Sequence, residues 1–396
     1  MLIAVFLIVI SPYTAFLPSL YMVYRVLTDK LTIYKNPWNM GLFVLFIWSF
    51  LSGLLNKSLL STLASIAVLL YLFLSIFIQN YLKTEALIEK LFRCFIYFSI
   101  FSGIFGIIEK LVFIRSNDNI LTVLLGVASK ATIGHRIYST FGNPNIAGHW
   151  FAVMILVSLY FAVNVSKGKT MFYRAAAVLF VISLCLTGSR GSYAGFLTGL
   201  PVFYFLNRKK RDTLFITLIA LPVLILTFMP SQAPTLSHIT GHQLDRSIVT
   251  RDMIWDGCLN MIKMKPIKGW GILGIFENGK KFISYEGIVY HGHNIWIHFL
   301  TTLGVIGLSI YMYLKFHIYK NLWVLYTQNS RLVPLLMGIQ ALIIGHGLVD
   351  ISMLAPQSGL IFISTSAIIS SLAMHYEIAL EGNDLVNSLE PLSKTG

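Results

Sequence analysis

The chain has 396 residues, of which 56% are hydrophobic and only 12% are charged, and its mean hydropathy is +0.74. Soluble domains carry about twice this charged fraction, so the composition excludes a soluble protein. The net charge of +14 would suggest nucleic acid in a soluble protein, but here the basic residues lie in short loops, where they orient membrane spans and predict no nucleic-acid partner.

The apolar residues form runs that are long enough to cross a bilayer core as helices, which takes about 20 residues. Membrane β-barrels show short alternating segments instead. The sequence therefore predicts an all-α integral membrane protein with about 11–12 transmembrane helices. We expect the spans near residues 3–27, 39–56, 59–80, 92–113, 145–165, 172–188, 192–206, 212–229, 294–315, 333–350 and 357–375.

The two ends of the chain differ in composition. The N-terminus is apolar from Met1 onward and lacks a basic leader, which predicts a first span rather than a cleaved signal peptide. Pro12 and Pro18 could break this span. We expect residues 1–376 to form the transmembrane domain and the polar residues 377–396 to form a cytoplasmic tail.

Basic residues cluster in alternate loops, around 83–93, 167–174, 208–211 and 315–331. The excess of Lys and Arg predicts that this side, including Lys315, is cytoplasmic. The opposite side then receives residues 114–144, the turn at 188–191 and a long segment over about 230–293. This last segment contains apolar residues at helical spacing up to Pro266, which predicts an amphipathic helix on the outer membrane surface.

Five ionisable residues from separate segments fall at one depth on this outer side: Arg136, Arg190, Arg251, His293 and Asp350. Ionisable groups at the ends of spans are costly unless they are paired or used, so we hypothesise that they form one site. We expect no metal and no cofactor there, because the sequence lacks a close acidic pair, a Cys/His ligand spacing and a nucleotide-binding motif.

Each of these residues also has a structural interpretation. Arg190, in a glycine-flanked turn, can either mark the membrane edge or bind a phosphate bidentately. His293 can be an interfacial hydrogen-bonding residue or a general base. Arg251 and Trp255 share one face of a helix, and this face could either lie on the protein surface or contribute to the site. Asp350 can be a helix cap, an ion-pair partner or a group that orients an Arg or His. For His291 and His298 the structural interpretation is preferred.

At these residues the chain resembles the superfamily of O-antigen ligases and O-antigen polymerases, which are bacterial envelope glycosyltransferases. The matching stretches are 139–148 (STFGNPNIAG), 186–191 (LTGSRG), Arg251-x-x-x-Trp255 leading to 266–271 (PIKGWG), His293-Asn294 followed by Gly304-x-x-Gly307, and Asp350. The resemblance covers residues of about 130–360, whereas the first four spans match only as generic hydrophobic helices.

The resemblance implies a GT-C-like, inverting and metal-independent glycosyltransferase in the bacterial cytoplasmic (inner) membrane, with its active site facing the extracytoplasmic side. Its donor would be a glycan on undecaprenyl pyrophosphate, and its acceptor would be a hydroxyl of a glycan or glycolipid. Membrane lipids would surround the protein. Arg190, Arg251 and His293 would be catalytic. The residues expected to bind substrate are Arg136, Asn143, Asn145, Trp255, Asn294 and Asp350.

Arginines can stabilise a leaving pyrophosphate without a metal, and a histidine can deprotonate the attacking hydroxyl. The same chemistry serves a ligase, our first hypothesis, and a polymerase that extends lipid-linked glycan, the alternative. A transporter of lipid-linked sugars is the hypothesis from another class. It is less favoured because transporters place polar residues near the bilayer midplane in repeated halves, and the sequence has no visible repeat.

Overall fold

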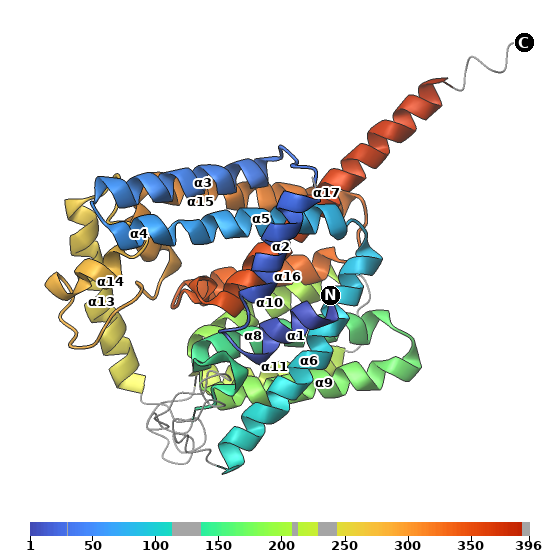
Figure 1. The fold of residues 1–396 in the computed structure, drawn as a ribbon. Helices are drawn as coiled ribbons and strands as arrows, with labels where there is room; N and C mark the ends of the chain where they lie inside the picture. Colours follow the sequence, from blue (N-terminus) through green and yellow to red (C-terminus); the bar gives the residue numbers. More distant parts are fainter. Residues whose placement is uncertain (30, 113–135, 208–212, 229–243, 390–396) are drawn as a thin grey trace, which may run out of the picture.

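The computed structural model describes residues 1–29, 31–112, 136–207, 213–228 and 244–389, and these residues form helices and connections without a strand (Figure 1). The all-α prediction is confirmed. Seven described helical stretches are long and apolar enough to cross a membrane, and two shorter apolar helices, Thr213–Thr227 and Val333–Gly347, accompany them. The total of about 11–12 spans stays a prediction.

The helices follow the predicted spans in order. Their bounds are α1 Leu2–Ile10, α2 Leu17–Thr28, α3 Pro37–Leu55, α4 Leu59–Ala64, α5 Ile66–Tyr81, α6 Glu85–Val112, α8 Pro144–Asn164, α9 Lys167–Thr187, α10 Arg190–Leu206, α11 Thr213–Phe228, α13 Leu244–Met264, α14 Gly274–Asn278, α15 Ile295–Thr327, α16 Val333–Gly347 and α17 Pro356–Leu389. Three short 3₁₀ turns, η1 Ser139–Phe141, η2 Gly279–Lys281 and η3 Ser352–Leu354, lie between them.

Several boundaries differ from the expected spans, and three of these differences are clear from their contacts or extent. The first span is broken between α1 and α2, where Pro12 lies and where Thr14 Oγ1 donates to Leu7 O (2.6 Å). Helix α15 continues to Thr327, which places Lys315 inside it, only 4% exposed, and corrects its expected place in a loop. Helix α17 continues to Leu389, beyond the expected end of the last span.

Helix α8 lies in the middle of the bundle, and nearly all its side chains are buried. Beside it, α10 and α16 approach closely because glycines face the contact. A Cβ on Gly199 would lie 2.6 Å from Gly338 O, and one on Gly195 would lie 2.8 Å from Leu342 O. Small residues at such contacts let helix backbones pack tightly in membranes. This packing holds the start of α10 against the end of α16.

Helix α15 is interrupted at Gly304, whose φ of 65° and ψ of −168° are not helical. The break frees backbone groups, which need new partners inside a membrane protein. The carbonyls of the three residues before it accept from Trp270 N (3.0 Å), Gly271 N (2.8 Å) and Trp48 Nε1 (2.8 Å), and the amide after it donates to Pro266 O (2.9 Å). The 266–271 segment therefore fills the break.

The outer segment, so named for the side of the membrane on which its sequence predicts it to lie, carries its own small core. From α13, the side chains of Ile254, Cys258 and Met261 are buried against Trp270 and Ile283. The predicted helix before Pro266 is confirmed, although it begins earlier, at Leu244; its place on a membrane surface stays a prediction. Helices α13 and α14 lie at one end of the bundle, and the C-terminal part of α17 projects beyond the opposite end (Figure 1).

Candidate active site

The site is centred on the carboxylate of Asp350, which is only 4% exposed. Its Oδ1 accepts hydrogen bonds from His291 Nε2 and His293 Nδ1, both at 3.2 Å. Its Oδ2 accepts one from Asn145 Nδ2 at 2.7 Å. Three segments, from the start of α8, the loop before α15 and the end of α16, therefore meet at one buried charge.

Local backbone features place these groups. Helix α16 ends at Gly347, and the Asp350 amide donates to His346 O (3.0 Å), so the chain turns there and directs the carboxylate inward. His293 has a φ of 47°, which is uncommon for a residue other than glycine and typical of functional sites. The next residue, Asn294, caps α15 through its Oδ1 and donates from Nδ2 to Leu348 O (2.8 Å).

The charge state of Asp350 follows from these contacts. Burial alone would raise its pKa, but the hydrogen bonds from His291 and His293 and their nearby charges hold the pKa well below its usual value. Asp350 is therefore ionised at neutral pH. An ionised carboxylate that accepts from Nδ1–H of His293 leaves Nε2 of that ring as the nitrogen able to take a proton.

Arg136 is tied into the same network by two hydrogen bonds. Its Nε donates to Thr187 O (2.6 Å) and its Nη2 to Asn145 Oδ1 (2.7 Å). Burial lowers the pKa of Arg136, and the positive charge of Arg251 adds to that effect, whereas Asp350 opposes it. The guanidinium remains charged, and these two bonds use only two of its five donors. Asn145 thus links the arginine to the carboxylate.

The segment that carries Arg136 is held by a carboxylate from α6. Glu109 accepts from Tyr138 N (3.1 and 3.2 Å) and Ser139 N (2.7 Å). Ser139 has a φ of 52°. Farther along, Asn143 caps α8 by accepting from Asn145 N (2.8 Å). This fixes Asn145 at the first turn of the helix, and it gives Asn143 a local structural role.

Helix α13 reaches the site from the outer segment. Arg251 Nε donates to Val349 O (3.0 Å), next to Asp350, and Trp255 Nε1 donates to Gly292 O (3.0 Å), between the two histidines. The two residues are one helical turn apart, so one face of α13 clamps both segments that build the site. The interpretation of this face as surface alone is not supported by these contacts.

Arg190 is the first residue of α10 and is half-buried. Gly188 before it has a φ of 59° and ends α9, and Ser189 caps α10. Ser192 Oγ donates to Asn145 O (3.2 Å), and a Cβ on Gly191 would lie 3.1 Å from Val349 Cγ2. The backbone of Arg190 therefore lies beside both Asn145 and the Asp350 segment.

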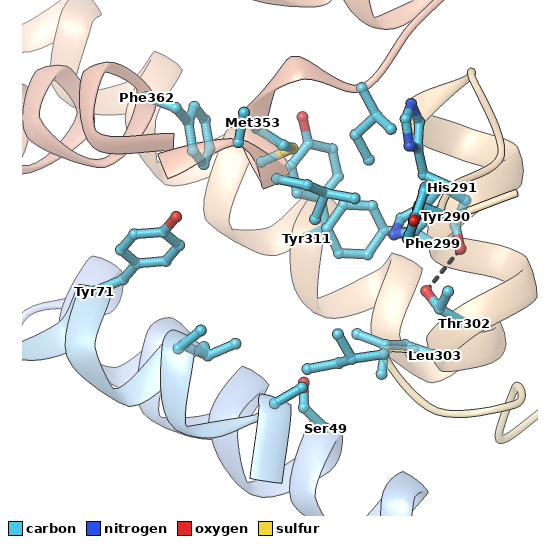
Figure 2. A pocket seen from close by; sticks show the side chains of 18 of the residues that line it. Ser49, Tyr71, Tyr290, His291, Phe299, Thr302, Leu303, Tyr311, Met353 and Phe362 are labelled. Atoms are coloured by element: carbon cyan, nitrogen blue, oxygen red, sulfur yellow. Dashed lines mark hydrogen bonds between the residues drawn. The ribbon is translucent and has the colours of Figure 1, made fainter. Parts of the chain in front are cut away.

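An apolar cavity of about 510 Å³ opens from this polar cluster into the bundle. His291, His293, Asn145 and Asp350 line one part of it. Side chains of α3, α5, α15 and α17 line the rest, and Figure 2 shows several of them around the hollow, including Ser49, Tyr71, Phe299, Leu303, Tyr311 and Phe362. The site thus joins a charged end to a largely apolar chamber, within the volume range of ligand pockets.

A second pair of polar side chains lies one helical turn deeper. His149 follows Asn145 by four residues on α8, and His346 precedes Asp350 by four on α16. Their rings are 4.9 Å apart, and both are buried. Like the Asn145–Asp350 bond above it, this contact joins α8 to α16 beneath the site.

Residues 175–312 of the chain match the family model described as O-antigen ligase. This stretch of the chain is therefore similar to O-antigen ligases. It is 26% identical to a "Putative polysaccharide ligase" of Rickettsia felis over 212 residues, which are 50% of this chain and 49% of that protein. A protein of the same description from Rickettsia conorii is also 26% identical, over 50% of this chain and 48% of its own length.

The third relative, an uncharacterized protein of Haemophilus influenzae, is 26% identical over 34% of this chain and 37% of its own length. The chain spans about half the length of the curated ligase relatives it matches. The matched residues include Arg190, Arg251 and His293, whereas Asn145 and Asp350 lie outside them.

Sequence reasoning missed two residues of the candidate site, His291 and Glu109. His291 contacts the same oxygen as His293, although we interpreted it as an ordinary interfacial histidine; the His-Gly-His spacing was the available signal. Glu109 gave no signal, because a single acidic residue at the end of a span resembles any membrane-edge charge. His298, by contrast, is a buried ring whose Nδ1 accepts from Gly292 N (3.5 Å).

Among the described residues, one cluster of three side chains could bind a metal ion together. The donor atoms of His291, His293 and Asp350 lie within 4.8 Å of one another. The sequence did not suggest this set, because its members are separated by more than fifty residues and include His291. Two imidazoles and a carboxylate suit a transition metal such as zinc, so metal dependence has to be decided by chelation.

Proposed function

We propose that this protein transfers a glycan from undecaprenyl pyrophosphate to a sugar hydroxyl of a glycan or glycolipid acceptor at the outer face of the cytoplasmic membrane. The observation that carries the proposal is the ionised Asp350 paired with His293 at the polar end of an apolar cavity among membrane helices. The O-antigen ligase match and the relatives described as polysaccharide ligases support the same reaction class.

The geometry suits each part of a lipid-linked donor. The apolar chamber offers room for the first isoprenoid units, which cannot lie in water. Arg136 and Arg251 approach the polar end of the chamber, and Arg190 starts the helix beside it. Guanidinium groups bind phosphate oxygens bidentately and stabilise the charge that develops when a pyrophosphate leaves.

The proposed step is a single displacement. His293 Nε2 takes the proton of the acceptor hydroxyl while the oxygen of that hydroxyl attacks the anomeric carbon of the donor sugar. The new glycosidic C–O bond forms as the bond from that carbon to the pyrophosphate oxygen breaks, and the pyrophosphate departs on its lipid carrier. Attack from the face opposite the leaving group inverts the anomeric carbon. Asp350 keeps the imidazole oriented and stabilises its protonated form.

The test is reconstitution of purified protein with a defined lipid-linked glycan and a separate acceptor, followed by mass spectrometry of the products. We expect glycan on the acceptor and free lipid pyrophosphate. Lengthened lipid-linked chains without another acceptor would make the protein a polymerase, which uses the same site. Movement of the donor across liposomes without bond formation would overturn the proposal in favour of a transporter.

Chelation is a second arm of the same experiment. Because the arginines supply the positive charge that the leaving group needs, we expect EDTA to leave the transfer rate unchanged. A loss of activity in EDTA that zinc restores would instead assign the His291, His293 and Asp350 group to a metal.

A further inference from the structure

A second cavity, of about 420 Å³, lies at the other end of the bundle between α6 and α9. It is lined by Arg93, Tyr97, Val165, Lys169, Phe172 and Tyr173. Helix α8 runs from Asn145 in the site to Asn164, just before this cavity. At 1.5 Å per residue, that is about 30 Å, the thickness of a bilayer core. The polar end of the first cavity and the second cavity therefore lie at opposite ends of α8, about one bilayer core apart.

The charge around the second cavity is positive. Lys90, Arg93 and Tyr97 recur at helical spacing on α6, and Lys90 and Lys169 are exposed. The described carboxylate beside them, Glu89, accepts from Arg93 Nη2 (2.9 Å) and from Tyr160 Oη (2.8 Å). Glu89 pairs with Arg93. Lys169 in the lining and Lys90 beside it, by contrast, form no ion pair among the described residues, so the pocket keeps a positive charge that complements an anion.

The wall of the cavity is aromatic and opens toward lipid. Tyr97 and Phe172 are 53% and 42% exposed, and their rings lie 5.6 Å apart. Beyond Tyr97, the same face of α6 continues with Phe101, Ile104 and Ile108, all exposed and all apolar. A bound molecule with an anionic head in the pocket could lay a hydrocarbon chain along this stripe.

We propose that this pocket binds the phosphate headgroup of an anionic phospholipid, with its acyl chains against the exposed face of α6. A basic pocket between apolar helices, with the exposed Tyr97 at its rim, fits this ligand class. Free phosphate shares the chemistry of the head but would make no use of the adjoining apolar stripe. The inference is independent of the transfer reaction at the other end of the protein.

The test is native mass spectrometry of the purified, detergent-solubilised full chain with phosphatidylglycerol, phosphatidylcholine or inorganic phosphate. We expect phosphatidylglycerol to bind at least about tenfold more tightly than phosphatidylcholine, because each basic residue near a membrane surface contributes about 1 kcal/mol toward anionic lipid. The double variant R93Q/K169Q should lose this preference. The matched control K83Q/K320Q removes the same charge at the same end and should keep it.

K169Q alone guards against misfolding, because Lys169 is exposed and its replacement leaves the Arg93–Glu89 ion pair in place. This variant should lose part of the preference while its melting temperature stays unchanged. Equal binding of the two lipids, or an equal loss in the control variant, would overturn the proposal. Displacement of phosphatidylglycerol by millimolar phosphate would also overturn it and assign the pocket to the free ion.

Discussion

At the scale of single residues, two histidines contact one carboxylate oxygen, and the proposal gives them different roles. His293 has the strained backbone and directly precedes the Asn294 cap, which fixes its position against α15. His291 shares Asp350 Oδ1 at the same distance of 3.2 Å. We infer that His293 takes the proton and that His291 helps hold Asp350 in place.

The variant His293→Ala should therefore lower kcat by about 10²–10⁴-fold, the usual contribution of a general base. His291→Ala should cost roughly tenfold, since Asp350 keeps its bonds to His293 and Asn145. Both variants should insert and fold normally, which size-exclusion chromatography checks. A larger loss of kcat in His291→Ala than in His293→Ala would exchange the two roles.

Arg190 tests the need for bidentate phosphate binding. Arg190→Ala should abolish detectable transfer, whereas Arg190→Lys should retain a small fraction, because an ammonium group keeps the charge but not the planar fork. The measurement is the rate of release of lipid pyrophosphate. Arg331→Ala, an exposed arginine paired with Glu85 at the other end of the bundle, is the control and should be fully active. Normal product yield from Arg190→Ala would remove this residue from the site.

At the scale of elements, the segment before α8 depends on α6. The Glu109 carboxylate accepts hydrogen bonds from the amides of Tyr138 and Ser139, and Ser139 Oγ also donates to Ser102 O of α6 (2.6 Å). Glu109→Ala should let this segment shift and misplace Arg136, which we expect to lower transfer about 10–100-fold, since small displacements at a site are costly. Glu109→Gln, which keeps an acceptor oxygen, should recover most of the rate.

The matched control for Glu109 is Glu286→Ala, which removes an exposed acidic residue from the outer segment. It should leave the rate of transfer unchanged. If Glu109→Ala were as active as this control, the 138–141 segment would not need its carboxylate anchor.

The break in α15 also depends on contacts between two separate elements of the fold. A side chain at Gly304 would meet the backbone of Ile267, and the φ of 65° disfavours any branched residue. Gly304→Val should expel the 266–271 segment and lower the free energy of unfolding by more than about 2 kcal/mol, seen as a reduced melting temperature. Gly168→Ala, where a Cβ meets nothing within 4 Å, should change little.

The same break shows which parts of the fold a sequence can reveal. Apolar runs predicted most helices within a few residues, because burying backbone groups in lipid leaves few alternatives. The sequence contained both Gly304 and the 266–271 motif, yet their pairing depends on tertiary contacts and not on local pattern. The prediction that Lys315 lies in a loop was wrong for the same reason. Its Nζ donates to Oε1 of Gln340 in the next helix (2.7 Å), and the spacing of residues in the sequence does not predict such a contact.

The site was partly predictable because its ionisable residues share one depth in the membrane. In the structure, the segments that carry Arg136, Arg251, His293 and Asp350 do meet, and the role of these residues in one site stays a prediction. The sequence could not show that Asn145 bridges Arg136 to Asp350, since an amide carries no charge to mark it.

At the scale of the whole molecule, the proposed function depends on which membrane side each end faces. Helices α13 and α14, which contact the site, lie at one end, and the connection between α5 and α6 and the C-terminal part of α15 lie at the other (Figure 1). The second end carries Lys83 and Lys320. The excess of Lys and Arg predicts that the second end is cytoplasmic, so a donor presented outside would meet the site directly.

Cysteine labelling tests this orientation. Lys281→Cys, exposed in the outer segment, should react with a membrane-impermeant maleimide in spheroplasts, whereas Lys320→Cys should react only after permeabilisation. Background should be low, because Cys94 and Cys258 are buried and Cys185 is half-buried. The unmodified chain serves as the control. Reaction of Lys320→Cys, but not Lys281→Cys, in intact spheroplasts would put His293 and its arginines in the cytoplasm, where an outward-facing lipid-linked donor could not reach them.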